Sequence, residues 1–155
     1  IDENENAIMV ATDHAKKNKL NIDYKKMSFD KINFSKKFDV IVCMEVLEHL
    51  HDVDMLVTKV SQILKPSGYF IGSTINKTFN SYIQAIFFAE NVLNIVPKET
   101  HNWKKFVRPN HLKKKLMFKN FNDIKFQGVQ FNPLKNEWKL IKSLSVNYMF
   151  SSKLK

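Results

Sequence analysis

Apolar residues dominate the run from Phe38 to Met44, which carries the clearest structural signal in the chain. A short run of this kind is typical of a strand that is buried on both faces of a parallel sheet, so we expect a central strand here. Before it, Asn21 to Lys26 alternates apolar with polar residues, as a half-buried strand does. The segment from Ala7 to Lys19 places apolar residues among helix formers at helical spacing and predicts a short amphipathic helix.

A second helix and a third strand follow the apolar run. Asp52 is a good N-cap, and the helix that it begins ends at the turn Lys65-Pro66-Ser67-Gly68. Tyr69 to Thr74 then reads as a strand. Strands that alternate with helices at this spacing predict an α/β fold, with right-handed crossovers and a parallel sheet covered by helices. The apolar face of the helix consists of Val53, Leu56, Val57, Val60, Ile63 and Leu64.

The second half of the chain mixes one long helix with further strands. Phe79 to Val96 predicts an apolar and aromatic helix, but polar residues such as Gln84 and Glu90 argue against a membrane span. Asp123 to Phe131 alternates as a strand, and Ser145 to Phe150 predicts a last strand. Turns are predicted between them at Asn132-Pro133 and Lys135-Asn136.

The composition is that of one ordinary globular domain with a strong excess of positive charge. The chain has 155 residues, of which 44% are hydrophobic, and a net charge of +10. Such a charge favours an anionic partner, either nucleic acid or an acidic lipid surface. Trp103 and Phe106 lie among lysines as in some nucleic-acid-binding modules, but the chain contains no known motif of that class, so nucleic acid is the disfavoured partner. The basic cluster consists of Lys104, Lys105, Arg108, Lys113, Lys114 and Lys115.

Cysteine and glycine are both scarce. The single Cys43 has no partner for an internal disulfide, which favours a reducing compartment and a small buried side chain in the strand. Only 3 glycines occur, and none precedes Gly68, so no glycine-rich cofactor loop lies before the apolar strand. The chain also begins at Ile1 rather than at Met, and we therefore expect a partial sequence.

The residues that follow the apolar strand are the first candidates for chemistry. Glu45, Glu48 and His49 are spaced i, i+3 and i+4, so a helix starting directly after the strand would project all three to one side. Two carboxylates and an imidazole suit a hard divalent cation, and His49 alone suits a general base near neutral pH. A third interpretation is that these side chains only orient the loop and cap the helix.

Asp2 is a candidate of another kind. It lies a few residues before the first predicted helix, where an acid in a dinucleotide-type fold accepts hydrogen bonds from ribose hydroxyls. The alternative interpretation is an exposed acid near a helix start, and Glu3 and Glu5 show that acids are not rare here.

Several local sequences together resemble the ubiquinone-biosynthesis O-methyltransferases, also called 3-demethylubiquinone 3-O-methyltransferases. The resemblance runs through nearly the whole chain. Its strand-end and turn motifs are shared by many S-adenosylmethionine (SAM) methyltransferases, whereas Pro97-Lys-Glu-Thr-His101 and Asn147-Tyr148-Met149 are more particular to this family. The segments that carry it are Cys43-Met-Glu-Val-Leu-Glu-His-Leu50, Leu64-Lys-Pro-Ser-Gly68, Ser73-Thr-Ile-Asn76, Val96-Pro-Lys-Glu-Thr-His101, Lys105-Phe106 with Pro109, Asn132-Pro133 and Val146-Asn-Tyr-Met149.

The resemblance implies a Rossmann-like class I SAM methyltransferase sheet with flanking helices, lacking the first strand and its glycine-rich loop. Residues 1–155 would then be the C-terminal portion of a single methyltransferase domain, with a helical basic insertion at about 77–119. It implies a SAM site in which Asp2 holds the ribose, Ser28 and Phe29 line the adenine pocket, and Met44 packs near the cofactor. It also implies a divalent cation such as Mg²⁺ at Glu45, Glu48 and His49.

The activity that the resemblance implies is SAM-dependent methylation of a hydroxyl on a polyprenylated catechol or benzenoid in ubiquinone biosynthesis. We expect this activity of the parent protein and not of this segment alone. Such a substrate is confined to membranes, so we expect an anionic membrane surface as a partner, bound by the helix from Phe79 to Val96 and the basic cluster. A ubiquinone-biosynthesis complex is a further expected partner. The expected location is the cytoplasmic side of the inner membrane, or the matrix side in a mitochondrion.

Two alternatives stay open at this point. One is another small-molecule SAM methyltransferase, for example a C-methyltransferase acting on a quinone or sterol. The other is a non-catalytic methyltransferase relic that serves as a lipid-binding partner.

Overall fold

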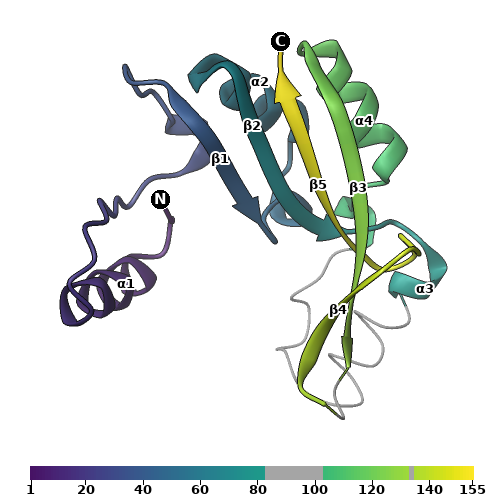
Figure 1. Cartoon of the computed structure of the whole chain (residues 1–155), viewed down its shortest axis with the longest axis horizontal. Helices are drawn as coiled ribbons and strands as arrows, with labels where there is room; N and C mark the ends of the chain where they lie inside the picture. Colours follow the sequence, from purple (N-terminus) through teal and green to yellow (C-terminus); the bar gives the residue numbers. More distant parts are fainter. Residues whose placement is uncertain (83–102, 133–134) are drawn as a thin grey trace. The chain divides into compact units, whose positions relative to one another are not determined.

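The computed structural model describes residues 1–82, 103–132 and 135–155. Within them the chain forms two compact units, Ile1–Ser35 and Lys36–Lys155 (Figure 1). The division of the chain into a methyltransferase domain with a basic insertion stays a prediction.

The unit Ile1–Ser35 is built around one helix, α1 (Glu5–Lys17), as predicted. Asn4 caps it, because its side-chain oxygen accepts the N–H groups of Asn6 at 2.9 Å and Ala7 at 3.3 Å. The strand predicted over residues 21–26 is wrong, since of these residues only Lys26 pairs, in a single parallel bridge with Asp2. An alternating segment forms a strand only where neighbouring strands pair with it, and this segment has a single bridge instead of a ladder. A short 3₁₀ helix, η1 (Phe29–Lys31), follows.

The unit Lys36–Lys155 contains a five-stranded sheet in the order β1-β2-β5-β3-β4. Among the described strands only β1 and β2 are parallel, while β5 runs antiparallel to both β2 and β3, and β4 runs antiparallel to β3. The expectation of a parallel sheet therefore holds for one pair. Because β3 ends at Asn132 and β4 begins at Glu137, these two strands are too close in sequence to be parallel neighbours, which require a crossover of a dozen residues or more. The strands are β1 (Phe38–Met44), β2 (Leu64–Ile75), β3 (Phe121–Asn132), β4 (Glu137–Ile141) and β5 (Asn147–Leu154).

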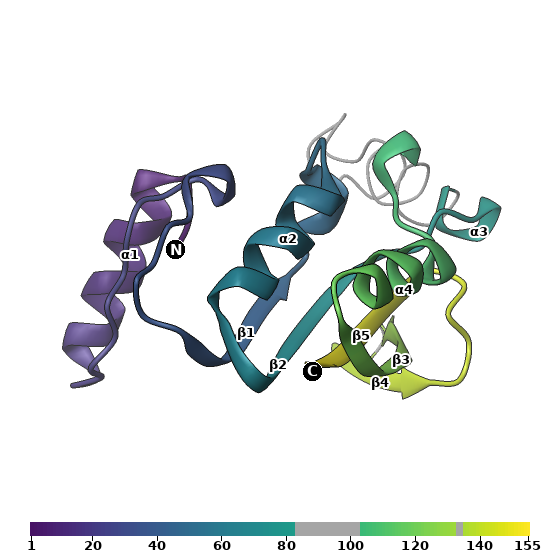
Figure 2. The ribbon, with the colours of Figure 1, turned by 90° about the horizontal axis from the view of Figure 1, so that it is seen from above.

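Two helices of this unit, α2 (Val53–Ile63) and α4 (Pro109–Phe118), lie on the same face of the sheet (Figure 2). Asp52 caps α2 as predicted, since its side chain accepts the Met55 N–H at 3.0 Å. The helix predicted from Phe79 to Val96 begins with α3 (Phe79–Ser81), and residues 83–96 lie outside the described residues. The described part of this unit also contains the 3₁₀ helices η2 (Leu47–His49) and η4 (Trp103–Lys105).

The core lies between these helices and the sheet. Phe70 of β2 is fully buried and contacts Phe121 and Phe150, with ring centroids 6.1 and 5.1 Å away. Leu112 and Leu116 of α4 are also fully buried. These side chains join β2, β3 and β5 into one apolar layer beneath α4.

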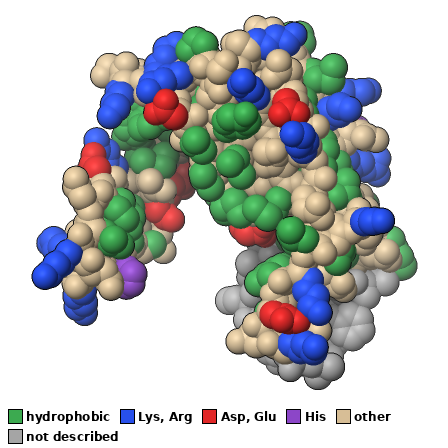
Figure 3. All heavy atoms as spheres, in the orientation of Figure 1, with side chains coloured by type: hydrophobic (Ala, Val, Ile, Leu, Met, Phe, Trp, Pro, Cys, Tyr) green, Lys and Arg blue, Asp and Glu red, His purple; other side chains and the backbone are tan. Residues whose placement is uncertain are grey.

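The strand β1 lies at an edge of this sheet, where β2 is its ladder partner. Val40 and Val42 are 48% and 61% exposed, so the expectation that both faces of β1 are buried is wrong for the described structure. The helices α2 and α4 cover only one face, and Figure 3 shows hydrophobic side chains gathered on the other. Composition alone does not reveal which strand of a sheet lacks a second neighbour.

Candidate active site

The candidate site begins where β1 ends beside β2. Met44 pairs with Ser73 of β2, and the next residue, Glu45, turns the chain with a φ of 52°. The Glu45 N–H donates to both the carbonyl and the hydroxyl oxygen of Ser73, each at 3.1 Å. A left-handed residue is uncommon outside glycine, and here three contacts with Ser73 fix it. No α-helix therefore starts at Glu45.

The two carboxylates that follow are each held by a hydroxyl of β2. The Ser73 hydroxyl donates to Glu45 Oε1 at 2.5 Å, and the Thr74 hydroxyl donates to Glu48 Oε2 at 2.7 Å. Glu45 is exposed, whereas Glu48 is only 3% exposed. The site thus has one carboxylate at the surface and one inside the protein.

Burial is the main cause that raises the pKa of Glu48 to about 7. The nearby Glu45 carboxylate acts in the same direction, and the hydrogen bond from Thr74 opposes both. Glu48 can therefore hold or release a proton near neutral pH, which is a property of acid and base groups in enzymes. Burial also raises the pKa of the Cys43 thiol to about 12, as expected for an unreactive cysteine in a strand.

His49 does not join the two carboxylates on one side of a helix, so that expectation is wrong. Leu47–His49 is a 3₁₀ helix, in which Glu48 is buried while His49 is exposed. A 3₁₀ helix has three residues per turn, so the spacing that aligns side chains on an α-helix does not apply. Among the described residues, no group of three or more His, Cys, Asp and Glu side chains is placed to hold a metal ion.

The residues predicted to bind the cofactor fall in both units. Asp2 and Ser28 belong to Ile1–Ser35, where the Met27 N–H donates to the Asp2 carbonyl at 2.9 Å. The Ser28 hydroxyl donates to Glu3 Oε1 at 2.5 Å, and Phe29 begins η1 directly after it. The structure thus places the predicted ribose and adenine contacts next to each other. Met44 lies in the other unit and is 43% exposed.

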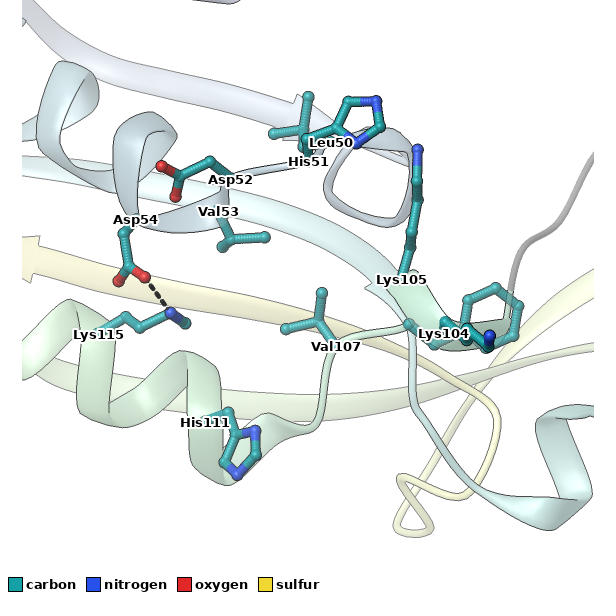
Figure 4. A pocket seen from close by; sticks show the side chains of 11 residues that line it. Leu50, His51, Asp52, Val53, Asp54, Lys104, Lys105, Val107, His111 and Lys115 are labelled. Atoms are coloured by element: carbon teal, nitrogen blue, oxygen red, sulfur yellow. Dashed lines mark hydrogen bonds and ion pairs between the residues drawn. The ribbon is translucent and has the colours of Figure 1, made fainter.

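A polar cavity of about 310 Å³ lies between the start of α2 and the start of α4 (Figure 4). Lys104 and Lys105 line it, and Lys115 forms an ion pair across it with Asp54. The Lys105 Nζ donates to the carbonyl of His49 at 3.1 Å, which ties the basic cluster to the end of the candidate site. His111 of α4 also lines this cavity and was not singled out from the sequence.

Sequence reasoning also missed Ser73 and Thr74 as parts of the site. Both belong to a segment that supports the family resemblance, yet no role was assigned to their hydroxyls. The available signal was their position, because these adjacent hydroxyl residues lie near the end of β2, the strand that follows β1 and its acidic residues. Only the register of β1 with β2 shows that they reach the carboxylates.

Comparison with known proteins agrees with this geometry. Residues 1–72 match the family described as "Methyltransferase domain". In structure, the chain is similar to an S-adenosylmethionine-dependent methyltransferase from Clostridium acetobutylicum, with a TM-score of 0.70, 14% identity, and coverage of 99% of this chain and 73% of that one. The chain therefore has the fold of the class I SAM-dependent methyltransferases, and the predicted fold class is confirmed.

In sequence, the chain is similar to proteins named ubiquinone biosynthesis O-methyltransferase. It is 44% identical over 149 residues to the protein of that name from Pelagibacter ubique, covering 96% of this chain and 62% of the relative. It is 40% identical over 146 residues to the one from Bartonella bacilliformis, covering 94% and 59%. The predicted resemblance is confirmed, and the chain spans about three fifths of the length of these relatives.

Proposed function

We propose that the protein containing this chain is a SAM-dependent O-methyltransferase that methylates a phenolic hydroxyl of a polyprenylated catechol in ubiquinone biosynthesis. The observation that carries this proposal is the 44% identity over 96% of the chain to a relative of that name. The carboxylate pair at the end of β1 supports it independently. In α/β sheets, ligands bind beyond the carboxyl ends of the strands, where Glu45 and Glu48 lie.

The residues predicted to bind the cofactor are chemically suited to SAM. The Asp2 carboxylate accepts hydrogen bonds of the kind that ribose hydroxyls donate, and the neighbouring Phe29 offers a ring against which an adenine can pack. SAM, when bound, supplies an electrophilic methyl group. The chain then has to orient the phenol and remove its proton.

Proton removal is the role that we propose for the end of β1. His49 is exposed and carries a side chain suited to a general base at neutral pH. The adjacent but buried Glu48, whose pKa is raised to about 7, can also hold or release a proton near neutral pH. The phenolic oxygen becomes a stronger nucleophile as its proton leaves, and fixed positioning of the reactants supplies much of the acceleration.

The direct test is transfer of a labelled methyl group from SAM to a short-chain prenylated catechol by the full-length gene product. His49→Ala should lower kcat by at least about 10²-fold, because a positioned general base contributes about that much. His51→Ala is the matched control, since His51 lines the cavity beside the site and should retain wild-type kcat. An unlabelled catechol after incubation with the wild type would refute the proposal.

A divalent cation such as Mg²⁺ at Glu45, Glu48 and His49 is a separate prediction from the resemblance. The described residues do not assemble the three ligands, so we derive no catalytic step through a cation. Two neighbouring carboxylates remain suitable oxygen ligands for a hard cation. Loss of activity on treatment with EDTA, with recovery on adding Mg²⁺, would support the prediction, whereas full activity in a metal-free preparation would contradict it.

We also propose an anionic membrane surface as a partner. Among residues 1–82, 103–132 and 135–155, no helix has the length and apolar character to cross a bilayer. The helix α4 instead exposes lysines together with apolar side chains: Lys113 and Lys114 are exposed, Met117 is 59% exposed and Phe118 is 82% exposed. This combination suits binding in the plane of an anionic bilayer. Residues 83–96 of the predicted amphipathic helix lie outside the described residues.

Sedimentation with vesicles tests this partner. The protein should bind phosphatidylglycerol vesicles and not phosphatidylcholine vesicles, with weaker binding at high salt. The double variant Lys113→Gln, Lys114→Gln should lose about 2 kcal/mol, or roughly 30-fold in partitioning. Lys16→Gln, Lys17→Gln on α1 removes the same charge and is the control. Equal binding of both double variants would count against α4 as the contact.

The proposed location follows from that partner: the cytoplasmic face of the inner membrane, or the matrix face in a mitochondrion. Association with a ubiquinone-biosynthesis complex is proposed for the same reason, because the product of one step stays in the membrane for the next. Co-purification from detergent-solubilised membranes, compared with the Lys113→Gln, Lys114→Gln variant, tests both.

A further inference from the structure

We propose that Ser73 and Thr74 are positioning residues of the methyl-transfer site, because their hydroxyls fix the carboxylates of Glu45 and Glu48. The expected changes in kcat rest on the proposed function, whereas the expected changes in carboxylate position do not. Neither hydroxyl is assigned a role by the sequence motifs or by the comparisons.

Ser73 acts on both the backbone and the side chain of Glu45. Its hydroxyl accepts the Glu45 N–H at 3.1 Å and donates to Glu45 Oε1 at 2.5 Å. A serine hydroxyl has one proton to donate, so this proton is committed to the carboxylate. The same side chain thereby stabilises the left-handed turn at Glu45 and sets the direction of its carboxylate.

Thr74 acts on Glu48 inside the protein. Thr74 is 0% exposed and Glu48 is 3% exposed, and the bond between Thr74 Oγ1 and Glu48 Oε2 is 2.7 Å long. In a buried site a hydrogen bond to a carboxylate is stronger than at the surface, so the loss of the Thr74 hydroxyl would remove a strong partner of the Glu48 carboxylate. Thr74 is in turn held in the sheet opposite Tyr148 of β5, whose hydroxyl donates to the Val107 carbonyl at 2.9 Å.

The two hydroxyls therefore anchor the loop from Glu45 to His49 to the rigid strand β2. β2 pairs with β1 on one side and β5 on the other, so its Cα positions are fixed by two ladders. The loop from Glu45 to His49 has no such ladder. Two adjacent hydroxyls on the rigid strand place both carboxylates, as a functional site requires of its supporting residues.

The test compares kcat and the KM for SAM in Ser73→Ala, Thr74→Val and Thr74→Ser. Ser73→Ala and Thr74→Val should each lower kcat about tenfold, with the KM for SAM within about twofold of the wild type. Thr74→Ser keeps the hydroxyl and should restore kcat. Ser152→Ala is the matched control, because Ser152 is a fully buried serine in the same sheet whose hydroxyl donates to the Phe70 carbonyl.

The proposal is overturned if Ser73→Ala and Thr74→Val lower kcat no more than Ser152→Ala, or if Thr74→Ser is as slow as Thr74→Val. Thermal melting of every variant identifies any that fails to fold, and crystal structures give a second readout. The variants should move the partner carboxylate by about 1 Å or more, a displacement that is costly for catalysis. If the wild type transfers no methyl group, the proposed function fails. The positioning role is then judged from the crystal structures alone, and it is overturned if the carboxylates of Glu45 and Glu48 lie in the same place in the variants as in the wild type.

Discussion

The buried Glu48 should make the folded protein less stable as the pH rises through neutrality. Its pKa is raised from 4.5 to about 7 in the folded state, mainly by burial. Between these two pH values the folded protein keeps the Glu48 proton while the unfolded chain has lost it. The folded state then binds more protons, so the free energy of unfolding falls as pH rises. The stabilisation is complete below pH 4.5 and is lost above pH 7.

The size of the effect follows from the same shift. At about 1.4 kcal/mol for each pH unit, the rise from 4.5 to about 7 corresponds to about 3 kcal/mol of stability lost across this range. Glu48 is 3% exposed, so solvent screening reduces this value little. Other groups titrate over the same range, and the contribution of Glu48 has to be isolated with a variant.

Glu48→Gln is that variant, because glutamine keeps an oxygen for the Thr74 hydroxyl and does not titrate. Urea unfolding in EDTA-containing buffer at pH 4.5, 6 and 7.5 gives the free energy of unfolding of each protein. The wild type should lose about 3 kcal/mol more than Glu48→Gln between the extremes. The control Glu137→Gln removes an exposed carboxylate that pairs with Lys139 at 3.1 Å, and should follow the wild type. Equal pH dependence in wild type and Glu48→Gln would refute the reasoning.

Three further predictions concern the core and the thiol. Phe70→Ala should lower the free energy of unfolding by about 3–5 kcal/mol in the same urea assay, because Phe70 is fully buried. Its control is Phe118→Ala, which should change the free energy of unfolding by less than about 0.5 kcal/mol because the Phe118 ring is 82% exposed. Gly72→Ala should cost about 1–3 kcal/mol, because a Cβ there would lie 2.6 Å from the Phe150 ring; an unchanged urea midpoint would contradict that contact. Cys43, with its thiol pKa raised to about 12, should resist iodoacetamide at pH 8 in the folded protein and react after unfolding, and rapid labelling of the folded protein would show that the thiol is accessible.

Elements with a strong local signal were predictable from the sequence. The apolar run predicted β1 with the bounds Phe38–Met44, and Asp52 predicted the start of α2, because strand and cap preferences act over a few neighbouring residues. The strand predicted over residues 21–26 failed since its alternating pattern has only one bridge to support it. β4 (Glu137–Ile141) was missed because its stability depends on pairing with β3 and not on its own composition.

The candidate site was predictable in part. The sequence identified Glu45, Glu48 and His49 as a group and could not assign their directions. An α-helix was assumed after β1, whereas the left-handed Glu45 and the 3₁₀ helix η2 bury Glu48 and expose His49. The family resemblance was also available from the sequence, because it depends on residue identities along nearly the whole chain.

The sequence by itself determined the elements with a strong local signal, such as β1 and α2, where acidic and imidazole groups follow a strand, and which relatives the chain matches. Tertiary structure alone decided that β1 is an edge strand among the described residues, that Ser73 and Thr74 meet the two carboxylates, and that Glu48 is buried. The physical reason is the distance along the sequence over which each interaction acts. Helix caps and hydrophobic periodicity depend on residues that are only a few positions apart. Strand register and burial depend instead on residues that are distant in sequence. Glu48 and Thr74 are an example, because the fold places Thr74 Oγ1 2.7 Å from Glu48 Oε2.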